Sequence, residues 1–203
     1  MSERPLVFLD LDRTLFDTRR APELWQVLAK HYDIDAEACS AERSRWYVWT
    51  DKTTYYHDFS AQLRSYNIDV AAAYEYLRHS PIGKGALEFP YVDVLVQTLV
   101  SLADVKVLTF GADDYQRVKA MLCPSLADIE IITTTESKRR ILEQYGHGRV
   151  CWVVDDRPIG HDLPEGVQFV QVALESEVPD FTEDWPIFTS LKDVKEYLYE
   201  KLH

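Results

Sequence analysis

Short apolar runs alternate with stretches of helical periodicity along most of the chain. Runs of strand length occur at 6–9, 105–109, 129–132, 150–154 and 167–170. Those at 6–9, 129–132 and 150–154 are almost entirely apolar, as strands buried on both faces are. Apolar residues recur at helical spacing over 91–102, 113–122, 136–145 and 191–202. Strands that alternate with helices predict an α/β fold, a Rossmann-like parallel sheet with helices on both faces.

The interval 17–85 interrupts this alternation. It has helical patterns after Pro22 and over 36–49, 54–66 and 69–79, with no convincing strand, and 81–85 follows as a linker. Near the other end of the chain, 181–188 has one proline shortly before it and one inside it, and it is expected to be irregular. We therefore expect an α/β core formed by residues 1–16 and 86–203, with residues 17–85 inserted into it as an α-helical subdomain.

Composition fits a globular protein with one domain and one insertion. Of the 203 residues, 46% are hydrophobic and 28% are charged, which excludes a wholly disordered chain. Acidic residues outnumber basic ones by 34 to 22, and the net charge is −12. So acidic a protein is a poor partner for a long nucleic acid or an anionic membrane.

Two further patterns bear on the cellular compartment in which the protein is expected. No apolar run approaches the ~18 residues that a membrane span needs, and the first residues lack the shape of a signal peptide. The three cysteines, Cys39, Cys123 and Cys151, form no C-x-x-C pair and are expected as thiols in a reducing environment. We therefore expect a cytoplasmic protein, either a monomer or a homodimer.

Asp10 and Asp12 directly follow the first apolar run. Ligands of open α/β sheets bind at the carboxyl ends of the strands. Two carboxylates there can divide two tasks, one attacking or binding metal and the other moving protons. The other interpretation is a solvated turn, where aspartate is common.

The longer string D-x-D-x-T-L after an apolar run resembles the first motif of the haloacid dehalogenase superfamily of phosphohydrolases. Later segments are similar to the other motifs of that family and come in the same order. They place a threonine at a strand end, a lysine near a helix start and two acids after another strand, at Thr109, Lys138, Asp155 and Asp156. The resemblance extends from residue 6 to about residue 160.

The resemblance implies catalytic roles for the first two acids. Asp10 is the expected nucleophile, which attacks phosphorus and forms an aspartyl-phosphate. Asp12 is expected to protonate the leaving oxygen and then to activate the water that hydrolyses the intermediate. Lys138 would supply fixed positive charge to the nucleophile and the transferring phosphoryl group.

The resemblance also implies substrate and metal contacts. Thr109, with Phe110 and Gly111 after it, is expected to bind a phosphoryl oxygen, as is Lys138. The implied cofactor is Mg²⁺, which favours oxygen ligands and bridges to phosphate. Its expected ligands are the Asp10 carboxylate, the Asp12 backbone carbonyl and one of the two later acids, with Asp156 preferred to Asp155.

Several assignments have alternatives. Thr109 also fits an ordinary strand end, and Lys138 a solvated helix start. Arg139 is the alternative for the motif cation, and Asp162 is a candidate for a further acid. Arg13 is a candidate for substrate contact.

The insertion stands where the family places a cap that closes over the site. Most aromatic residues in it should form its core, while one or two would line the cleft and suit a ring-bearing or sugar substrate. The candidates for such cleft residues come from one dense group in the sequence, namely Trp46, Tyr47, Trp49, Tyr55, Tyr56 and His57.

The expected function is that of a Mg²⁺-dependent phosphatase acting on a small phosphorylated metabolite. Phosphoryl transfer, as in a mutase, is an alternative that the motifs do not exclude. A non-catalytic binding or regulatory protein on the same scaffold is another, because a fold does not fix a function.

Overall fold

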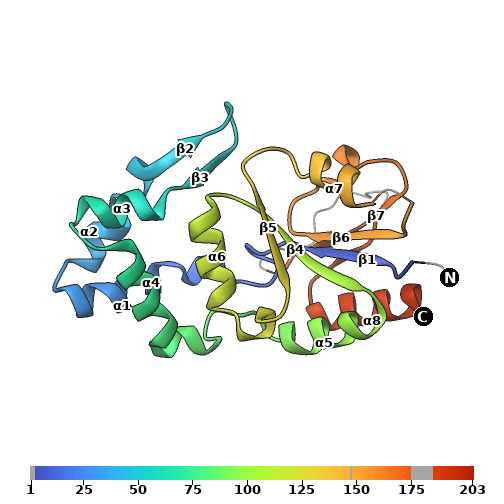
Figure 1. The fold of residues 1–203 in the computed structure, drawn as a ribbon, viewed down its shortest axis with the longest axis horizontal. Helices are drawn as coiled ribbons and strands as arrows, with labels where there is room; N and C mark the ends of the chain where they lie inside the picture. The colour runs from blue at the N-terminus through green and yellow to red at the C-terminus, as the bar shows by residue number, and fades with distance from the viewer. Residues whose placement is uncertain (1–2, 147, 175–184) are drawn as a thin grey trace.

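Strand β1 (Leu6–Leu9) lies in the middle of a parallel sheet. The computed structural model describes residues 3–146, 148–174 and 185–203. Within them, six strands form one sheet in the order β5-β4-β1-β6-β7-β8 (Figure 1). The other strands are β4 (Asp104–Phe110), β5 (Glu130–Thr134), β6 (Cys151–Asp155), β7 (Val167–Val172) and β8 (Ile187–Phe188). The predicted α/β fold is confirmed.

The alternation of side chains along β1 supplies both hydrophobic cores. Val7 and Leu9 belong to the larger apolar cluster, whereas Leu6 and Phe8 belong to a smaller one on the opposite face. In register, Leu6 pairs with Asp104 of β4 and with Cys151 of β6. Because β1 has a neighbour on each edge and a core on each face, its carboxyl end is held in a fixed position.

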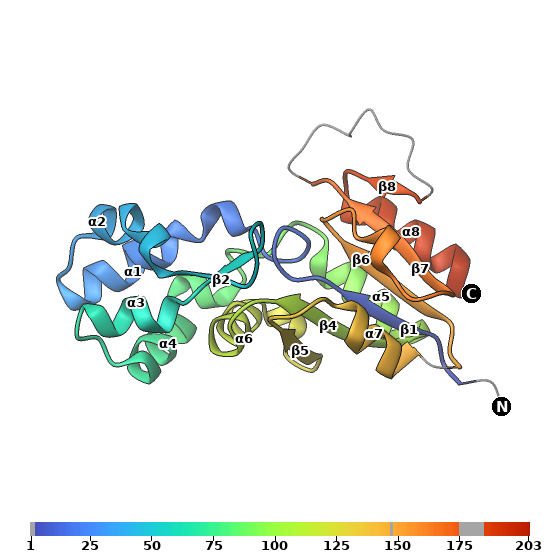
Figure 2. The same cartoon turned by 90° about the horizontal axis from the view of Figure 1, so that it is seen from above.

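Helices cover both faces of the sheet (Figures 1 and 2). On the face of the larger cluster lie α5 (Val92–Leu102), α6 (Asp113–Met121) and α8 (Leu191–Leu202). On the other face, α7 (Arg139–Gly146) packs its buried Leu142 into the smaller cluster.

The segment between β1 and α5 forms the opposite end of the molecule from α8 (Figure 1). It contains α1 (Pro22–Tyr32), α2 (Ala36–Ala41), α3 (Phe59–Ser65) and α4 (Val70–His79). Short 3₁₀ turns cover Thr18–Arg20, Arg43–Trp46 and Pro81–Lys84. Where the chain leaves and re-enters the core, Asp17 N donates to Leu87 O (2.8 Å) and Phe89 N to Leu15 O (3.0 Å).

A hairpin inside this segment corrects the expectation that it has no strand. Strands β2 (Tyr47–Trp49) and β3 (Tyr55–His57) pair antiparallel where helices over 36–49 and 54–66 were expected. Aromatic and β-branched residues favour strands. The Asp51 Oδ1 atom accepts hydrogen bonds from the backbone N–H groups of Thr53 and Thr54 (2.7 and 2.8 Å), which stabilises the turn.

Smaller differences occur at the ends of elements. The helix expected over 136–145 begins at Arg139, because the preceding residues form the loop that brings Lys138 to the sheet. Of the stretch expected to be irregular, 187–188 forms the short strand β8, and 181–184 lie outside the described residues.

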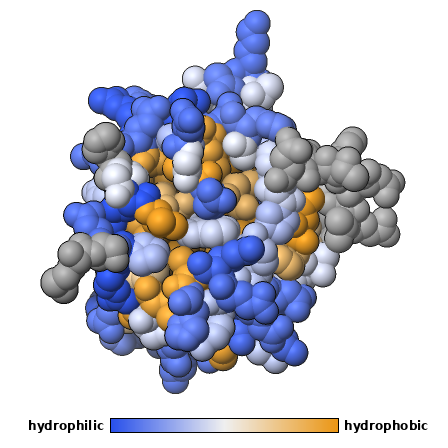
Figure 3. Space-filling model, turned by 90° about the vertical axis from the view of Figure 1, so that its right-hand side faces the viewer, coloured by the Kyte–Doolittle hydropathy of each residue, from blue (hydrophilic) through white to orange (hydrophobic). Residues whose placement is uncertain are grey.

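All three cysteines are buried free thiols. Within the described part of the chain, no helix has both the length and the apolar character of a membrane span. At the end of the molecule that carries the termini, apolar patches are interrupted by polar side chains (Figure 3). The carboxyl ends of the parallel strands face the other way, toward the segment with α1 to α4, and the site is found there.

Candidate active site

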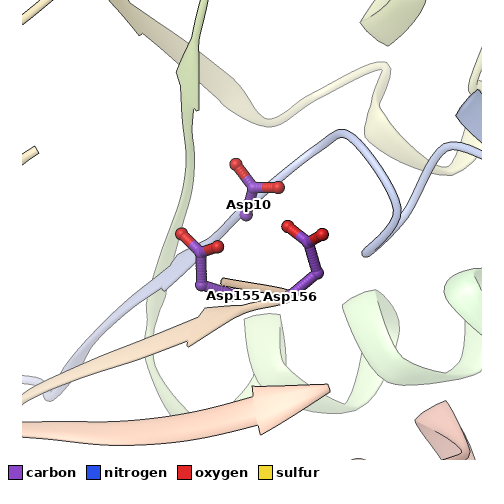
Figure 4. Close-up of side chains that lie close together, drawn as sticks. All are labelled: Asp10, Asp155 and Asp156. Atoms are coloured by element: carbon purple, nitrogen blue, oxygen red, sulfur yellow. The ribbon is translucent and has the colours of Figure 1, made fainter. Parts of the chain in front are cut away.

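Three carboxylates meet at the carboxyl ends of β1 and β6. Asp10 follows β1 and is anchored by its backbone N–H, which donates to Val154 O (2.8 Å). Asp155 ends β6, and Asp156 comes next. Oxygen atoms of the three side chains lie within 4.8 Å of one another, and the carboxylates point toward a common space (Figure 4).

Lys138 neutralises part of this charge. Its Nζ lies 2.5 Å from Asp10 Oδ1 and 2.6 Å from Asp155 Oδ2; both carboxylates are buried, and the lysine side chain is 12% exposed. Burial alone would lower the pKa of Lys138, but the two carboxylates outweigh burial and raise it. Lys138 is therefore a charged ammonium. Arg139, the alternative cation, instead pairs with Glu143 (2.9 Å).

The acids of the cluster resist ionisation. Burial raises the pKa of Asp10 well above its usual range, against the opposing effect of Lys138. Burial and the neighbouring charge of Asp155 raise the pKa of Asp156 to about 7. One ammonium is thus too little positive charge for two buried carboxylates and a third, half-buried one, and a cation bound between them would favour their ionised forms.

The two later acids have different partners. Asp155 contacts Lys138 and also accepts a hydrogen bond from the Arg157 backbone N–H (2.9 Å). In the described parts of the chain, no hydrogen bond is formed to the Asp156 side chain. Asp156 and the Oδ2 atom of Asp10, which also has no hydrogen bond from the described residues, are therefore best placed to accept a cation, and an all-oxygen set suits a hard ion such as Mg²⁺.

Asp12 lies outside this cluster and has its own partners. Lys119 Nζ lies 2.8 Å from both carboxylate oxygens of Asp12, Gln116 Nε2 donates to Oδ2 (3.1 Å), and the Thr18 hydroxyl donates to Oδ1 (2.8 Å). Burial opposes ionisation of Asp12, but these contacts, Lys119 first, outweigh it and lower its pKa. Asp12 is therefore an ionised carboxylate.

Lys119 and Gln116 were missed from the sequence. They stand three positions apart and so share a face of α6, the helix that follows Thr109. An amphipathic helix of this kind normally turns such residues to solvent. The signal that could have found them is their position on the first helix after the second motif, close to the same sheet edge as Asp12.

Thr109, Phe110 and Gly111 are tied to Gln116 as well. The Thr109 hydroxyl donates to Gln116 Oε1 (3.3 Å), and Gln116 Nε2 donates to Phe110 O (2.9 Å). Gly111 has φ of +149°, and a Cβ there would lie 2.3 Å from Gln116 Nε2. Only glycine therefore lets the chain pass so close to this glutamine.

A cavity of about 830 Å³ extends from the carboxylates to the β2–β3 hairpin. Arg13, with its left-handed φ of +61°, and Asp162 line it, although Asp162 is not part of the carboxylate cluster. Among the aromatic and histidine residues singled out in the insertion, Tyr47, Tyr55, Tyr56 and His57 line the cavity, whereas Trp46 and Trp49 are not among its lining residues.

The sequence matches no family model and no curated protein. Solved structures share its fold along nearly the whole chain. A haloacid dehalogenase-like hydrolase of Burkholderia xenovorans is 15% identical with a TM-score of 0.64, covering 98% of this chain and 99% of the other. The HAD hydrolase YfnB of Bacillus subtilis, solved with magnesium, is 13% identical with a TM-score of 0.58, covering 97% and 99%. A dehalogenase is 18% identical with a TM-score of 0.57, covering 98% of both chains.

These likenesses show that the chain has the fold of the haloacid dehalogenase-like hydrolases. They include both dehalogenases and other hydrolases, so the choice of chemistry depends on the site.

Proposed function

We propose that this protein is a Mg²⁺-dependent phosphatase that hydrolyses a small phosphorylated metabolite. The observation that carries the proposal is the pair of carboxylates after β1, with Asp10 held by Lys138 and Asp12 held by Lys119. One of them is positioned to attack, and the other to exchange protons.

In the first step, Asp10 attacks phosphorus and the bond to the leaving oxygen breaks, which gives an aspartyl-phosphate. The ammonium of Lys138 favours the ionised form of Asp10, against the effect of burial, and offsets charge on the transferring group. The substrate binds as the phosphate monoanion, and its proton passes through Asp12 to the leaving oxygen, which leaves Asp12 as a carboxylate again. In the second step, ionised Asp12 accepts a proton from the water that attacks phosphorus and regenerates Asp10.

Asp10 and Asp156 would hold Mg²⁺, with Asp155 positioning Lys138. The ion would supply positive charge to the phosphoryl oxygens. Excess negative charge at the cluster and the raised pKa of Asp156 support this assignment.

Asp12 favours phosphate ester hydrolysis over dehalogenation. A halide leaves as a stable anion and needs no proton, whereas an alkoxide leaving group does. A second carboxylate that can pass a proton to the leaving group therefore serves hydrolysis of a phosphate ester more than removal of a halide. The segment 17–85 would act as the cap, because its hairpin lines the cavity opposite the carboxylates.

The test is phosphate release from a panel of phosphomonoesters, with Mg²⁺ and with EDTA, by the wild type and by Asp10→Asn. We expect turnover that requires Mg²⁺ and falls at least about 10³-fold in the variant, since it lacks the nucleophile. Turnover that survives Asp10→Asn would refute the proposal. Transfer of phosphate to an added alcohol without release would indicate a phosphotransferase.

A further inference from the structure

Two buried polar atoms without a hydrogen-bond partner belong to residues that line the same part of the cavity. They are Arg43 Nε and His57 Nδ1. Arg43 lies in the 3₁₀ turn before β2, and His57 ends β3. Tyr47 connects them: it is the register partner of His57, with ring centroids 6.0 Å apart, and the Arg43 guanidinium lies 5.9 Å from the centre of its ring.

The hydrogen bonds of His57 fix its chemistry. Gln62 Nε2 donates to Cys39 O (2.6 Å), which orients the amide so that Gln62 Oε1 faces His57 Nε2 at 2.8 Å. The proton of the neutral ring is therefore on Nε2, and Nδ1 is an acceptor. Burial, reinforced by the charge of Arg43, lowers the pKa of His57 to about 4. At neutral pH, His57 offers an acceptor from a side chain that is 7% exposed.

Arg43 offers the complementary groups. Among the residues that the structure describes, no carboxylate pairs with it, whereas Arg45 of the same turn pairs with Glu42 (2.5 Å). Two lysines of the cavity already have carboxylate partners: Lys138 pairs with Asp10, and Lys119 pairs with Asp12. A buried donor that lacks a partner costs free energy. A ligand that supplies an oxyanion would remove that cost.

We infer that Arg43 and His57 form a leaving-group subsite that selects phosphomonoesters of hydroxy acids. The carboxylate of the leaving group accepts from the Arg43 guanidinium, and a hydroxyl of the leaving group donates to His57 Nδ1. This inference rests on the proposed phosphatase function and names its substrate class. Phosphate binds at Asp10 and Lys138, so the substrate spans the cavity from the sheet edge to the hairpin.

The test uses substrates that differ in one group. 3-Phosphoglycerate and glycerol 3-phosphate both carry a hydroxyl, but only the first has a carboxylate. Phenyl phosphate has neither group. We expect the wild type to prefer 3-phosphoglycerate to glycerol 3-phosphate by about 10- to 100-fold in kcat/KM. This is the usual contribution of one charge-assisted hydrogen bond to binding.

Two variants separate the two contacts. Arg43→Met should abolish the preference for the carboxylate and leave phenyl phosphate hydrolysis within about 2-fold. His57→Phe keeps an aromatic ring at this position but lacks the acceptor, so it should weaken turnover of both glycerol-based substrates about 5- to 10-fold relative to phenyl phosphate. Arg45→Met, on the same turn with a side chain that is 69% exposed, is the matched control and should behave like the wild type.

Binding provides a readout that needs no turnover. Calorimetry with Asp10→Asn protein should give tighter binding of 3-phosphoglycerate than of glycerol 3-phosphate, and adding Arg43→Met should equalise them. Equal binding of the two compounds before that change, or an equal effect of Arg43→Met on all substrates, would overturn the subsite. If phenyl phosphate hydrolysis still depends on Mg²⁺ and Asp10, such a result refutes the subsite alone. Loss of that dependence refutes the proposed function.

Discussion

Lys119 Nζ lies equidistant, at 2.8 Å, from the two carboxylate oxygens of Asp12. Its side chain is only 5% exposed, and its ammonium also lies 4.4 Å from the centre of the Tyr115 ring. This ion pair joins α6 to the loop after β1, with the lysine buried and the Asp12 side chain 27% exposed. Removing one partner of such a pair leaves the other charge without compensation.

Lys119→Met should therefore destabilise the protein by about 3 kcal/mol. Urea unfolding of the wild type and the variant measures this change. The double variant with Asp12→Asn should recover much of the loss, because the isolated carboxylate is then removed as well. Additive losses in the double variant would show that the two side chains do not interact as the structure indicates.

Asp12→Asn should reduce kcat for alkyl phosphomonoesters by about 10²- to 10⁴-fold, the usual contribution of general acid–base catalysis. For p-nitrophenyl phosphate, formation of the aspartyl-phosphate should be reduced much less, since its leaving oxygen needs no proton. Rapid-quench measurement of that step with both substrates gives the comparison. An equal reduction of the step for both would exclude Asp12 as the acid.

Asp156→Asn should weaken Mg²⁺ binding about 10- to 100-fold, because it removes a carboxylate with no other hydrogen-bond partner in the described structure. The rise in melting temperature across a Mg²⁺ titration measures this affinity. Asp162→Asn is the matched control, since Asp162 lines the cavity but is not in the carboxylate cluster. A similar weakening by both changes would argue against a site at the cluster.

His57 makes stability depend on pH. Its pKa is lowered from 6.5 to about 4 by burial and by Arg43, so between these values the unfolded chain binds more protons than the folded one. The free energy of unfolding should therefore fall as the pH drops from 6.5 to 4, by on the order of 3 kcal/mol from this residue. His57→Gln should flatten that part of the profile, as measured by urea unfolding at several pH values. An unchanged difference between pH 6.5 and 4 would contradict the burial of a neutral ring.

The sheet could largely be predicted from the sequence because β1 and β6 are buried on both faces and their apolar runs stand out from the helices. The run at 129–132, expected to be buried in the same way, forms the edge strand β5 and is only half-buried, since in the described part of the chain it has a neighbouring strand on one side alone. The carboxylates after β1 and β6 could be placed at one edge because of the apolar runs of those two strands. The hairpin β2–β3 could not, because three-residue strands give too short an alternation to be distinguished from helical spacing. Its aromatic residues fitted either structure.

The partners of Asp12 could not be predicted for a different reason. Lys119 and Gln116 are polar residues on an amphipathic helix, where polar residues usually face water. Whether they turn toward Asp12 depends on how α6 packs beside the sheet. The choice of Lys138 over Arg139 as the cation at Asp10 likewise depends on where α7 begins.

The central place of β1 has a consequence for the order of assembly during synthesis. It is synthesised before both of its neighbours, β4 and β6, and Val154 O receives the backbone hydrogen bond of Asp10. All residues from Asp10 to Val154 have to emerge before that bond can form. Such distant pairing slows folding, and the apolar β1 strand remains exposed to chaperones and to other nascent chains until then.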